Sequence, residues 1–230
     1  MKRIALGMIG GGEGAFIGEV HRMAARLDDR YELVAGALSS DPQRARQSAQ
    51  ALGITSERSY GDFREMARAE AARADGIEVA VVVTPNHLHF EVAKAMLEAG
   101  IHVVCDKPLS TSLATAEQLR GLVSRTGRLF MVTYNYSGYP LVRQAREMVQ
   151  SGDLGKLRLV QVEYPQDWLA TDIESSGMKQ AAWRTDPDQA GPGGSIGDIG
   201  THAFHLAEFV SGQQVKELLA DLHSFVDGRK

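Results

Sequence analysis

Short β-branched runs alternate with longer segments of helical periodicity through the first 134 residues, and this order constrains the fold more than any other feature. The expected strands cover residues 3–10, 32–38, 78–84, 101–106 and 129–134, and the expected helices cover 18–27, 42–52, 63–74, 88–99 and 113–126. Several strands are apolar on both faces, which is typical of a sheet that helices cover on both sides. The sequence therefore predicts an α/β fold with a doubly wound parallel sheet.

The pattern changes after Tyr134, where we expect a domain boundary. From there the sequence predicts, in order, a helix near 141–150, a strand over 157–164, a polar segment with glycine and proline over 165–195, a helix that carries Asp198, and a strand near 215–225. We therefore expect two domains, residues 1–133 and residues 134–230.

Composition narrows the class of protein. The 230 residues are 43% hydrophobic and 23% charged, as in ordinary globular proteins. No apolar run approaches the roughly 18 residues that a membrane span needs. The net charge is −4 with acidic and basic residues interspersed, so the sequence offers no basic patch for nucleic acid. The single cysteine, Cys105, excludes an intrachain disulfide and a cysteine-rich zinc site. We expect a cytoplasmic protein without a membrane or nucleic-acid partner.

A glycine-rich turn joins the first expected strand to the first expected helix. Such a turn presents backbone N–H groups and a helix N-terminus to a pyrophosphate, so it indicates a dinucleotide site. Taking Gly10, Gly12 and Gly18 as the glycines of G-x-G-x-x-G leaves three extra residues before the last one. The alternative is a loop chosen for its turn geometry alone. The expected cofactor contacts here are Gly10, Gly12, Gly14, Phe16, Ile17 and Gly18.

The end of the second strand bears on the choice between NAD and NADP. An acidic residue at this place normally binds the ribose hydroxyls of NAD, whereas small hydroxyl residues with a nearby arginine accommodate the phosphate of NADP. Ser39 and Ser40 stand where the carboxylate is expected, and Arg44 follows on the next helix. Asp41 keeps NAD open, although its place before Pro42 also suits a helix N-cap. NADP is favoured over NAD.

Two further strand ends carry polar residues at the sheet edge where open α/β folds bind ligands. The expected cofactor contacts there are Thr84, Pro85, Asn86 and His89 after the third strand, and Asp106 and Lys107 after the fourth. Pro108 biases Lys107 away from helix, so the cation is held at a strand end. An ordinary surface lysine is the alternative.

Asp198 and His202 stand four residues apart in a glycine-rich segment. On a regular α-helix their side chains would lie about 40° apart on one face. The pair could act on one substrate hydroxyl, although a helix cap and an interior histidine are the plainer interpretations.

The chain resembles the glucose-fructose oxidoreductase, inositol dehydrogenase and rhizopine-catabolism (Gfo/Idh/MocA) family in four segments that occur in the same order: the glycine-rich turn, Thr84-Pro85-Asn86 with His89, Asp106-Lys107-Pro108, and the Asp198/His202 segment. The resemblance implies an N-terminal Rossmann domain that holds NAD or NADP. It also implies an α/β substrate domain with an open, mostly antiparallel sheet, and it assigns catalysis to Lys107, Asp198 and His202.

Besides the lengthened glycine loop, the chain departs from the family pattern at two places. Asp106 stands where the family commonly has glutamate, which keeps the charge on a shorter side chain. Family members also typically continue beyond the helix that carries the histidine, with strands that complete the second sheet. We therefore expect either a fragment of a longer protein or a truncated substrate domain with an unprotected sheet edge. Homo-oligomerisation through that sheet is expected only if the sheet is complete.

The resemblance implies reversible oxidation of a secondary alcohol on a sugar, polyol or inositol-like substrate, without a metal. Imidazole titrates near neutral pH, so His202 suits general acid/base catalysis. Lys107 would hydrogen-bond the reacting oxygen, and Asp198 would orient the histidine or bind a neighbouring hydroxyl. Weaker candidates for substrate contact, which serve equally well as packing residues, are Tyr134, Asn135, Trp168, Trp183 and Arg184.

Two other classes of function remain open. Asp198, His202 and His205 could ligate a metal in a hydrolase, but this leaves the glycine-rich turn and Lys107 without a role. The second is a nucleotide-binding sensor or scaffold without turnover, which would retain the cofactor site while a shortened second domain lacks a working pocket.

Overall fold

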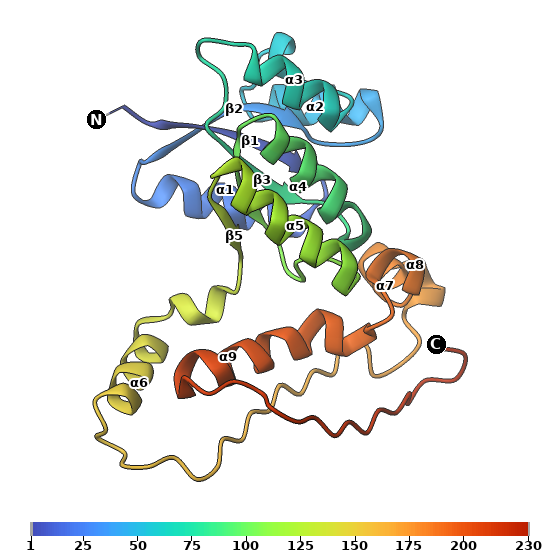
Figure 1. Cartoon of the computed structure of the whole chain (residues 1–230). Helices are drawn as coiled ribbons and strands as arrows, with labels where there is room; N and C mark the ends of the chain where they lie inside the picture. Colours follow the sequence, from blue (N-terminus) through green and yellow to red (C-terminus); the bar gives the residue numbers. More distant parts are fainter. Residues whose placement is uncertain (1, 230) are drawn as a thin grey trace. The chain divides into compact units, whose positions relative to one another are not determined.

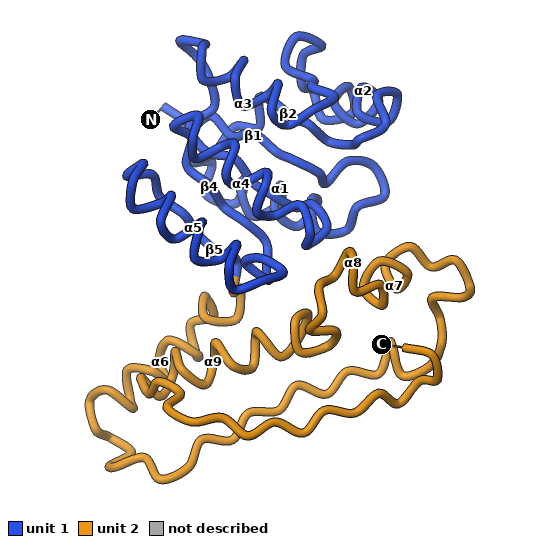
Figure 2. Tube along the Cα trace, turned by 45° about the vertical axis from the view of Figure 1, so that its right-hand side comes forward, with its two compact units in different colours: residues 1–133 blue, residues 134–230 orange. Residues whose placement is uncertain are grey.

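The computed structural model describes residues 2–229, and the chain divides into two compact units. Unit 1 covers residues 1–133 and unit 2 covers residues 134–230 (Figure 2). The two units are described separately below.

Unit 1 contains one sheet in which every pair of neighbouring strands is parallel, in the order β2-β1-β3-β4-β5. The strands are β1 (Ile4–Gly10), β2 (Tyr31–Ala37), β3 (Val79–Val83), β4 (His102–Cys105) and β5 (Phe130–Val132). The order reverses at β1, so β1 and β3 flank the point where ligands bind in open α/β sheets. The predicted parallel sheet is confirmed.

Helices cover both faces of this sheet. They are α1 (Phe16–Leu27), α2 (Pro42–Ala51), α3 (Phe63–Ala71), α4 (His89–Glu98) and α5 (Leu113–Thr126). One core cluster joins the sheet to α3, α4 and α5, and a second lies on the opposite side with residues of α1 and α2. Figure 1 shows α4 and α5 side by side over one face. All five residues of β3 are buried, which explains why its sequence is apolar throughout.

A buried ion pair accompanies the first core cluster. The Glu70 side chain is fully buried and accepts hydrogen bonds from the Arg58 guanidinium, from the Tyr60 hydroxyl at 2.8 Å and from the Ile77 N–H at 3.1 Å. Burial and the hydrogen bond to Glu70 raise the pKa of Tyr60 to about 12. These contacts satisfy the buried carboxylate and link the segment before α3 to the segment that enters β3.

Unit 2 contains helices but no strand among its described residues. Its helices are α6 (Pro140–Gln150), α7 (Lys179–Arg184), α8 (Pro187–Ala190) and α9 (Thr201–Ser211), and a π-helical turn (Ile196–Gly200) precedes α9. The Arg146 guanidinium of α6 lies 4.4 Å from the ring centroid of Phe209 in α9 and donates to its carbonyl at 2.8 Å. None of the described helices in either unit is long and apolar enough to cross a membrane.

The described residues of unit 2 do not show the antiparallel sheet that the sequence predicts for the second domain. Residues 157–164 and 215–225 carry no strand pairing in the described structure, and Figure 2 shows both as long extended stretches of unit 2. A strand exists only when its N–H and C=O groups pair with a neighbour, and two strands alone are marginal in water. Apolar side chains on both stretches are consequently exposed, including Leu159 at 79% and Leu219 at 98%.

Candidate active site

The glycine-rich loop between β1 and α1 depends on a close approach of two glycines. Gly10 and Gly11 adopt positive φ values of 78° and 71°, which glycine tolerates without strain. A Cβ atom on Gly18 would lie 2.4 Å from the Cα atom of Gly11. The loop therefore packs directly on the first turn of α1, and Gly11, which the sequence analysis left out, provides the contact.

Three hydrogen bonds from separate elements hold this loop. The Gly12 N–H donates to the Leu38 carbonyl after β2 at 3.2 Å, and the Glu13 N–H donates to the Ser48 hydroxyl of α2 at 3.0 Å. From α1, the Arg22 guanidinium donates to the Gly11 carbonyl at 2.6 Å. Burial lowers the pKa of Arg22. The sequence gives no signal for Ser48 or Arg22 as loop contacts, because each is brought to the loop only by the packing of its helix.

The residues at this edge fit a dinucleotide. Ala15 precedes α1 and supplies no side-chain cap, so no capping side chain accepts from the first N–H groups of the helix. Nothing lies within 4 Å of a Cβ built on Gly14, and the Phe16 side chain is 74% exposed. At the end of β3, the Thr84 hydroxyl is buried without a hydrogen-bond partner. Uncapped N–H groups, open space and an unsatisfied hydroxyl suit a pyrophosphate with its attached polar groups.

The end of β2 confirms that Asp41 caps α2. Its carboxylate accepts from the Arg44 N–H at 2.7 Å, while its own N–H donates to the Ser39 hydroxyl at 3.1 Å. Ser40 and the Arg44 side chain are exposed. The carboxylate therefore has a structural role, and hydroxyl groups with a nearby guanidinium remain at the surface.

His89 is enclosed between the loops that follow β3 and β4. Its side chain is 0% exposed, and its ring nitrogens lie 2.7 Å from the Pro108 carbonyl and 2.9 Å from the Thr84 carbonyl. Burial lowers the pKa of His89 more than the two carbonyls raise it. The ring ties the loop after β3 to the loop after β4, and its expected contact with the cofactor stays a prediction.

Asp106 fixes the start of the loop that carries Lys107. Its carboxylate accepts from the Thr133 hydroxyl after β5 at 2.5 Å and lies 3.4 Å from the His21 ring nitrogen of α1. Burial raises the pKa of Asp106, but the hydrogen bonds from His21 and Thr133 outweigh it, so the pKa lies below its ordinary value. Lys107 follows, half-buried, with a cis peptide bond to Pro108. The lysine thus follows an anchored carboxylate at the carboxyl end of β4.

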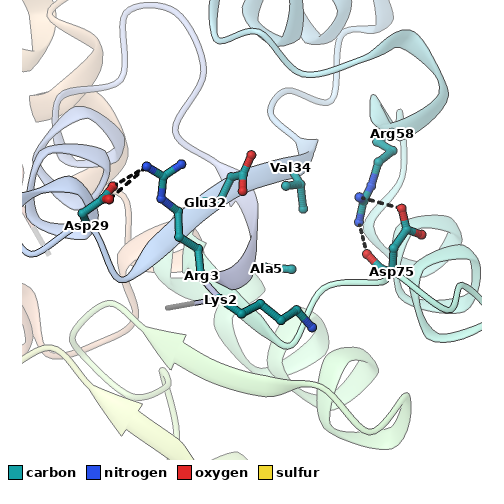
Figure 3. A pocket seen from close by; sticks show the side chains of 8 residues that line it. All are labelled: Lys2, Arg3, Ala5, Asp29, Glu32, Val34, Arg58 and Asp75. Carbon is teal, nitrogen blue, oxygen red and sulfur yellow. Dashed lines mark hydrogen bonds and ion pairs between the residues drawn. The ribbon is translucent and has the colours of Figure 1, made fainter.

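A pocket of unit 1 lies at the opposite edge of the sheet from these loops, at the start of β1 and β2 (Figure 3). Its charged groups pair with one another, as Arg3 does with Asp29 and Arg58 does with Asp75. Because acids and bases alternate there, the pocket offers little net charge to a phosphate. It is lined by Lys2, Arg3, Ala5, Asp29, Glu32, Val34, Arg58 and Asp75.

In unit 2, His202 is buried among aromatic rings. The centroid of its ring lies 4.8 Å from that of Tyr136 and 6.0 Å from that of Tyr134, both edge-on. The Tyr136 and Tyr164 hydroxyls hydrogen-bond each other, and this bond raises the pKa of Tyr136 to about 12. Tyr136 therefore stays protonated at neutral pH.

His205, on the same helix, stacks on Tyr134 at 4.2 Å, and burial lowers the pKa of its ring. Among the described residues, no group of three or more His, Cys, Asp or Glu side chains could hold a metal ion. The Asp198, His202 and His205 metal cluster, kept open by the sequence, is therefore not assembled.

Asp198 lies in the π-helical turn, so the regular α-helical angle expected between Asp198 and His202 does not apply. A π turn widens the helix locally and is frequent at functional sites. The Asp198 carboxylate pairs with the Arg184 guanidinium at 3.2 Å. The sequence predicts Arg184 as a substrate contact, and its spacing from Asp198 gives no signal for this pairing.

The other substrate candidates are distributed over unit 2. Asn135 is exposed in a 3₁₀ turn (Asn135–Gly138) next to Tyr134. Trp168 and Trp183 are half-buried, and both rings lie beside the Arg184 guanidinium. Their role in substrate binding stays a prediction.

The family is decided by two sequence matches. A family model described as "Oxidoreductase family, NAD-binding Rossmann fold" matches residues 4–134, and a model of the GFO/IDH/MocA C-terminal domain matches residues 142–230. The chain belongs to the Gfo/Idh/MocA oxidoreductase family. The family resemblance and the Rossmann-type fold of unit 1 are thereby confirmed.

Individual relatives agree with this assignment. The chain is 37% identical over 230 residues to "Uncharacterized oxidoreductase YfiI" of Bacillus subtilis, covering 99% of this chain and 58% of the relative. A Sinorhizobium meliloti oxidoreductase structure has 54% identity and a TM-score of 0.88, covering 100% of this chain and 58% of that one. An Azotobacter vinelandii inositol dehydrogenase homolog, complexed with NADH and myo-inositol, has 39% identity and a TM-score of 0.83, with 92% and 53% covered. The chain thus spans little more than half the length of these relatives.

Proposed function

We propose that this chain is the catalytic part of an NAD(P)-dependent oxidoreductase that transfers hydride between a nicotinamide cofactor and a secondary alcohol of a sugar, polyol or inositol-like substrate. The observation that carries the proposal is the carboxyl edge of the sheet in unit 1. There, the loop packed through Gly11 and Gly18 and the anchored Lys107 segment stand at the ends of nearby strands. The Azotobacter relative, with its NADH and myo-inositol, supports the substrate class.

Unit 1 would hold the cofactor. The loop N–H groups and the uncapped start of α1 would bind the pyrophosphate, and the Thr84 hydroxyl would hydrogen-bond a polar group of the nucleotide. At the end of β2, the Ser39 and Ser40 hydroxyls with Arg44 would take the 2′-phosphate, because the Asp41 carboxylate already caps α2. We therefore favour NADP over NAD.

When bound, the cofactor supplies or accepts the hydride. In the oxidation direction, His202 takes the proton of the substrate hydroxyl, and in reduction it returns that proton. Lys107 donates a hydrogen bond to the reacting oxygen and favours its anionic form. The aromatic rings around His202 limit the access of water to the imidazole. Asp198 orients the histidine or binds a neighbouring hydroxyl.

The extended segments of unit 2 have a place in the same proposal. Residues 157–164 and 215–225 would be strands of an open antiparallel sheet in a longer protein, and that sheet would carry any homo-oligomer. The match of residues 142–230 to the family's C-terminal domain and the exposed apolar side chains of both segments support this. A longer form of the protein should show strand signal in far-UV circular dichroism beyond that of the five parallel strands.

The test of the proposed function is turnover on a panel of polyols, inositols and sugars, followed by nicotinamide absorbance. We expect at least one substrate to be oxidised, and Lys107→Ala to lower kcat by about 10²–10³-fold, which is typical for loss of one preorganised donor. Lys94→Ala, on the outer side of α4, is the matched control. Unchanged turnover in Lys107→Ala would remove the lysine from the mechanism. Cofactor binding without turnover on any substrate would select the sensor or scaffold instead.

A further inference from the structure

Arg184 joins two elements of unit 2, α7 and the π-helical turn, across 14 residues of sequence. It is the last residue of α7, and its Nε donates to the Oδ2 atom of Asp198 in the π-helical turn at 3.2 Å. Both side chains are partly buried, with 24% of the arginine side chain and 17% of the aspartate side chain exposed. A pair screened in this way from water is stronger than one on an open surface.

Besides Asp198, the Arg184 guanidinium contacts Gln180 and two tryptophans, which hold it in place. Its Nη1 donates to the Gln180 carbonyl at 3.1 Å and to the Gln180 side-chain oxygen at 2.7 Å. Its central carbon lies 4.2 Å from the ring centroid of Trp183 and 5.6 Å from that of Trp168. Cation–π contacts favour a guanidinium, which is planar and weakly hydrated, over an ammonium. One N–H of the group is consequently aimed at Asp198.

The backbone of the turn that carries Asp198 explains why the ion pair with Arg184 matters for the position of the carboxylate. The backbone there departs from the regular α-helix, and the glycines at 197 and 200 give the turn more conformational freedom than other residues would. A catalytic carboxylate displaced by about 1 Å can lose 10²-fold in rate. On the basis of the proposed function, we infer that Arg184 is a positioning residue, which holds the Asp198 carboxylate in the orientation that the reaction needs.

This role predicts a split between kinetic constants. Arg184→Ala should lower kcat by about 10–100-fold, because the carboxylate loses its orientation. The dissociation constant of NADPH should not change, because the groups that would bind it lie in unit 1. Arg184→Lys should recover only part of the activity, since an ammonium keeps the charge but lacks the planar fork. Arg158→Ala, an exposed arginine of unit 2, is the matched control.

Chemical rescue tests the position of the group directly. Added guanidinium, below denaturing concentration and with sodium chloride at equal ionic strength as the reference, should restore turnover of Arg184→Ala by entering the space beside Trp168 and Trp183. Urea has the same shape without the charge and should not restore it. Asp198→Asn in the same background should abolish the rescue. Equal rescue by urea, or no rescue by guanidinium in a folded variant, would overturn the inference.

A second measurement does not depend on turnover. The melting temperatures of the full chain, of Arg184→Met, of Asp198→Asn and of the double variant form a thermodynamic cycle. Shifts that are clearly not additive would support the pairing, and additive shifts would overturn it. If the cycle shows coupling while no substrate is turned over, the proposed function fails and the pairing stands, so the two failures are distinguishable.

Discussion

The two units differ in how they cover apolar surface. In unit 1, helices on both faces bury the strands. Fully buried residues there, each 0% exposed, include Met8, Val82, Met96 and Leu97. In unit 2, Ala181 is the only buried hydrophobic residue among those described, and Leu219 and Phe225 are exposed at 98% and 92%. A parallel sheet with its crossover helices buries its own apolar side chains, whereas the extended segments of unit 2 leave theirs exposed in the described structure. Unit 1 is therefore expected to carry most of the stability.

Both tryptophans of the chain, Trp168 and Trp183, lie in unit 2. Tryptophan fluorescence therefore reports unfolding of unit 2, while circular dichroism reports helices in both units. This separates the two regions in one urea titration, and we expect the fluorescence transition to precede the loss of most helical signal.

The largest effect is expected at the buried ion pair of unit 1. Glu70→Gln leaves the buried Arg58 charge with only the exposed Asp75 as an ion-pair partner, which should lower the free energy of unfolding by about 3–5 kcal/mol in urea titrations. Glu174→Gln in unit 2 removes an ion pair with Arg229 of similar chemistry near the surface. Its shift should be far smaller. Similar losses in both variants would contradict the contrast between the units.

A pair of leucine truncations compares the two regions without charge. Leu97→Ala should destabilise the chain by about 2–5 kcal/mol, because it leaves a cavity in the closed core. Leu219→Ala should change the midpoint of the same urea titration very little, because its side chain is already in water. A large effect at Leu219 would show that its segment is covered in solution.

The preference for NADPH over NADH tests whether the end of β2 in unit 1 binds the cofactor's 2′-phosphate. Arg44→Ala should weaken NADPH binding about tenfold, roughly 1.4 kcal/mol, by removing one charge from the 2′-phosphate site. Binding of NADH should remain unchanged, and Arg46→Ala on the same helix is the control. Equal weakening for both cofactors would remove Arg44 from phosphate recognition.

The smallest effects are expected in the pH dependence of stability. The folded pKa of His89 lies below that of an unfolded histidine, about 6.5, so the unfolded chain binds the extra proton first. The stability that neutral His89 contributes to the folded chain is fully present above pH ~6.5 and is lost as the pH falls through the folded pKa. Of the neighbouring titratable groups, Asp106 raises the pKa of His89 and His87 lowers it. His89→Asn should flatten the fall in melting temperature below neutral pH, and an unchanged slope would exclude His89 as its source.

Unit 2 should respond to acid in a lower range. The Arg229 hydrogen bond lowers the pKa of Glu174 to about 2 from an ordinary value of 4.5. The contribution of this pair is therefore present above pH 4.5 and is lost as pH falls from there through 2. The fluorescence midpoint should lose this dependence in Glu174→Gln.

The sequence predicted unit 1 well because its signals are local. Strands such as 79–83 are apolar throughout, and helix ends such as Gly127, with φ 63°, follow from the residue alone. The contact between Gly11 and Gly18 and the anchors from Ser48 and Arg22 were missed, because they depend on elements that meet only after folding.

In unit 2, local signals were insufficient. Alternating residues over 157–164 fit a strand, but alternation does not show whether a partner strand is present. The spacing of Asp198 and His202 predicts a regular α-helix, whereas the chain forms a π turn there. The ion-pair partner of Asp198 is Arg184, 14 residues earlier in the sequence. Candidate residue types were therefore identified from sequence, but their geometry was not.

The most direct test of the central claim is titration of the chain with NADPH and with NADH, followed by nicotinamide fluorescence. We expect saturable binding, tighter for NADPH, that persists in His202→Ala because that histidine belongs to unit 2. A Gly18→Val variant should lose binding, because its side chain would displace the loop at Gly11. A flat titration with both cofactors, in a chain shown to be folded, would contradict the proposed cofactor site of unit 1.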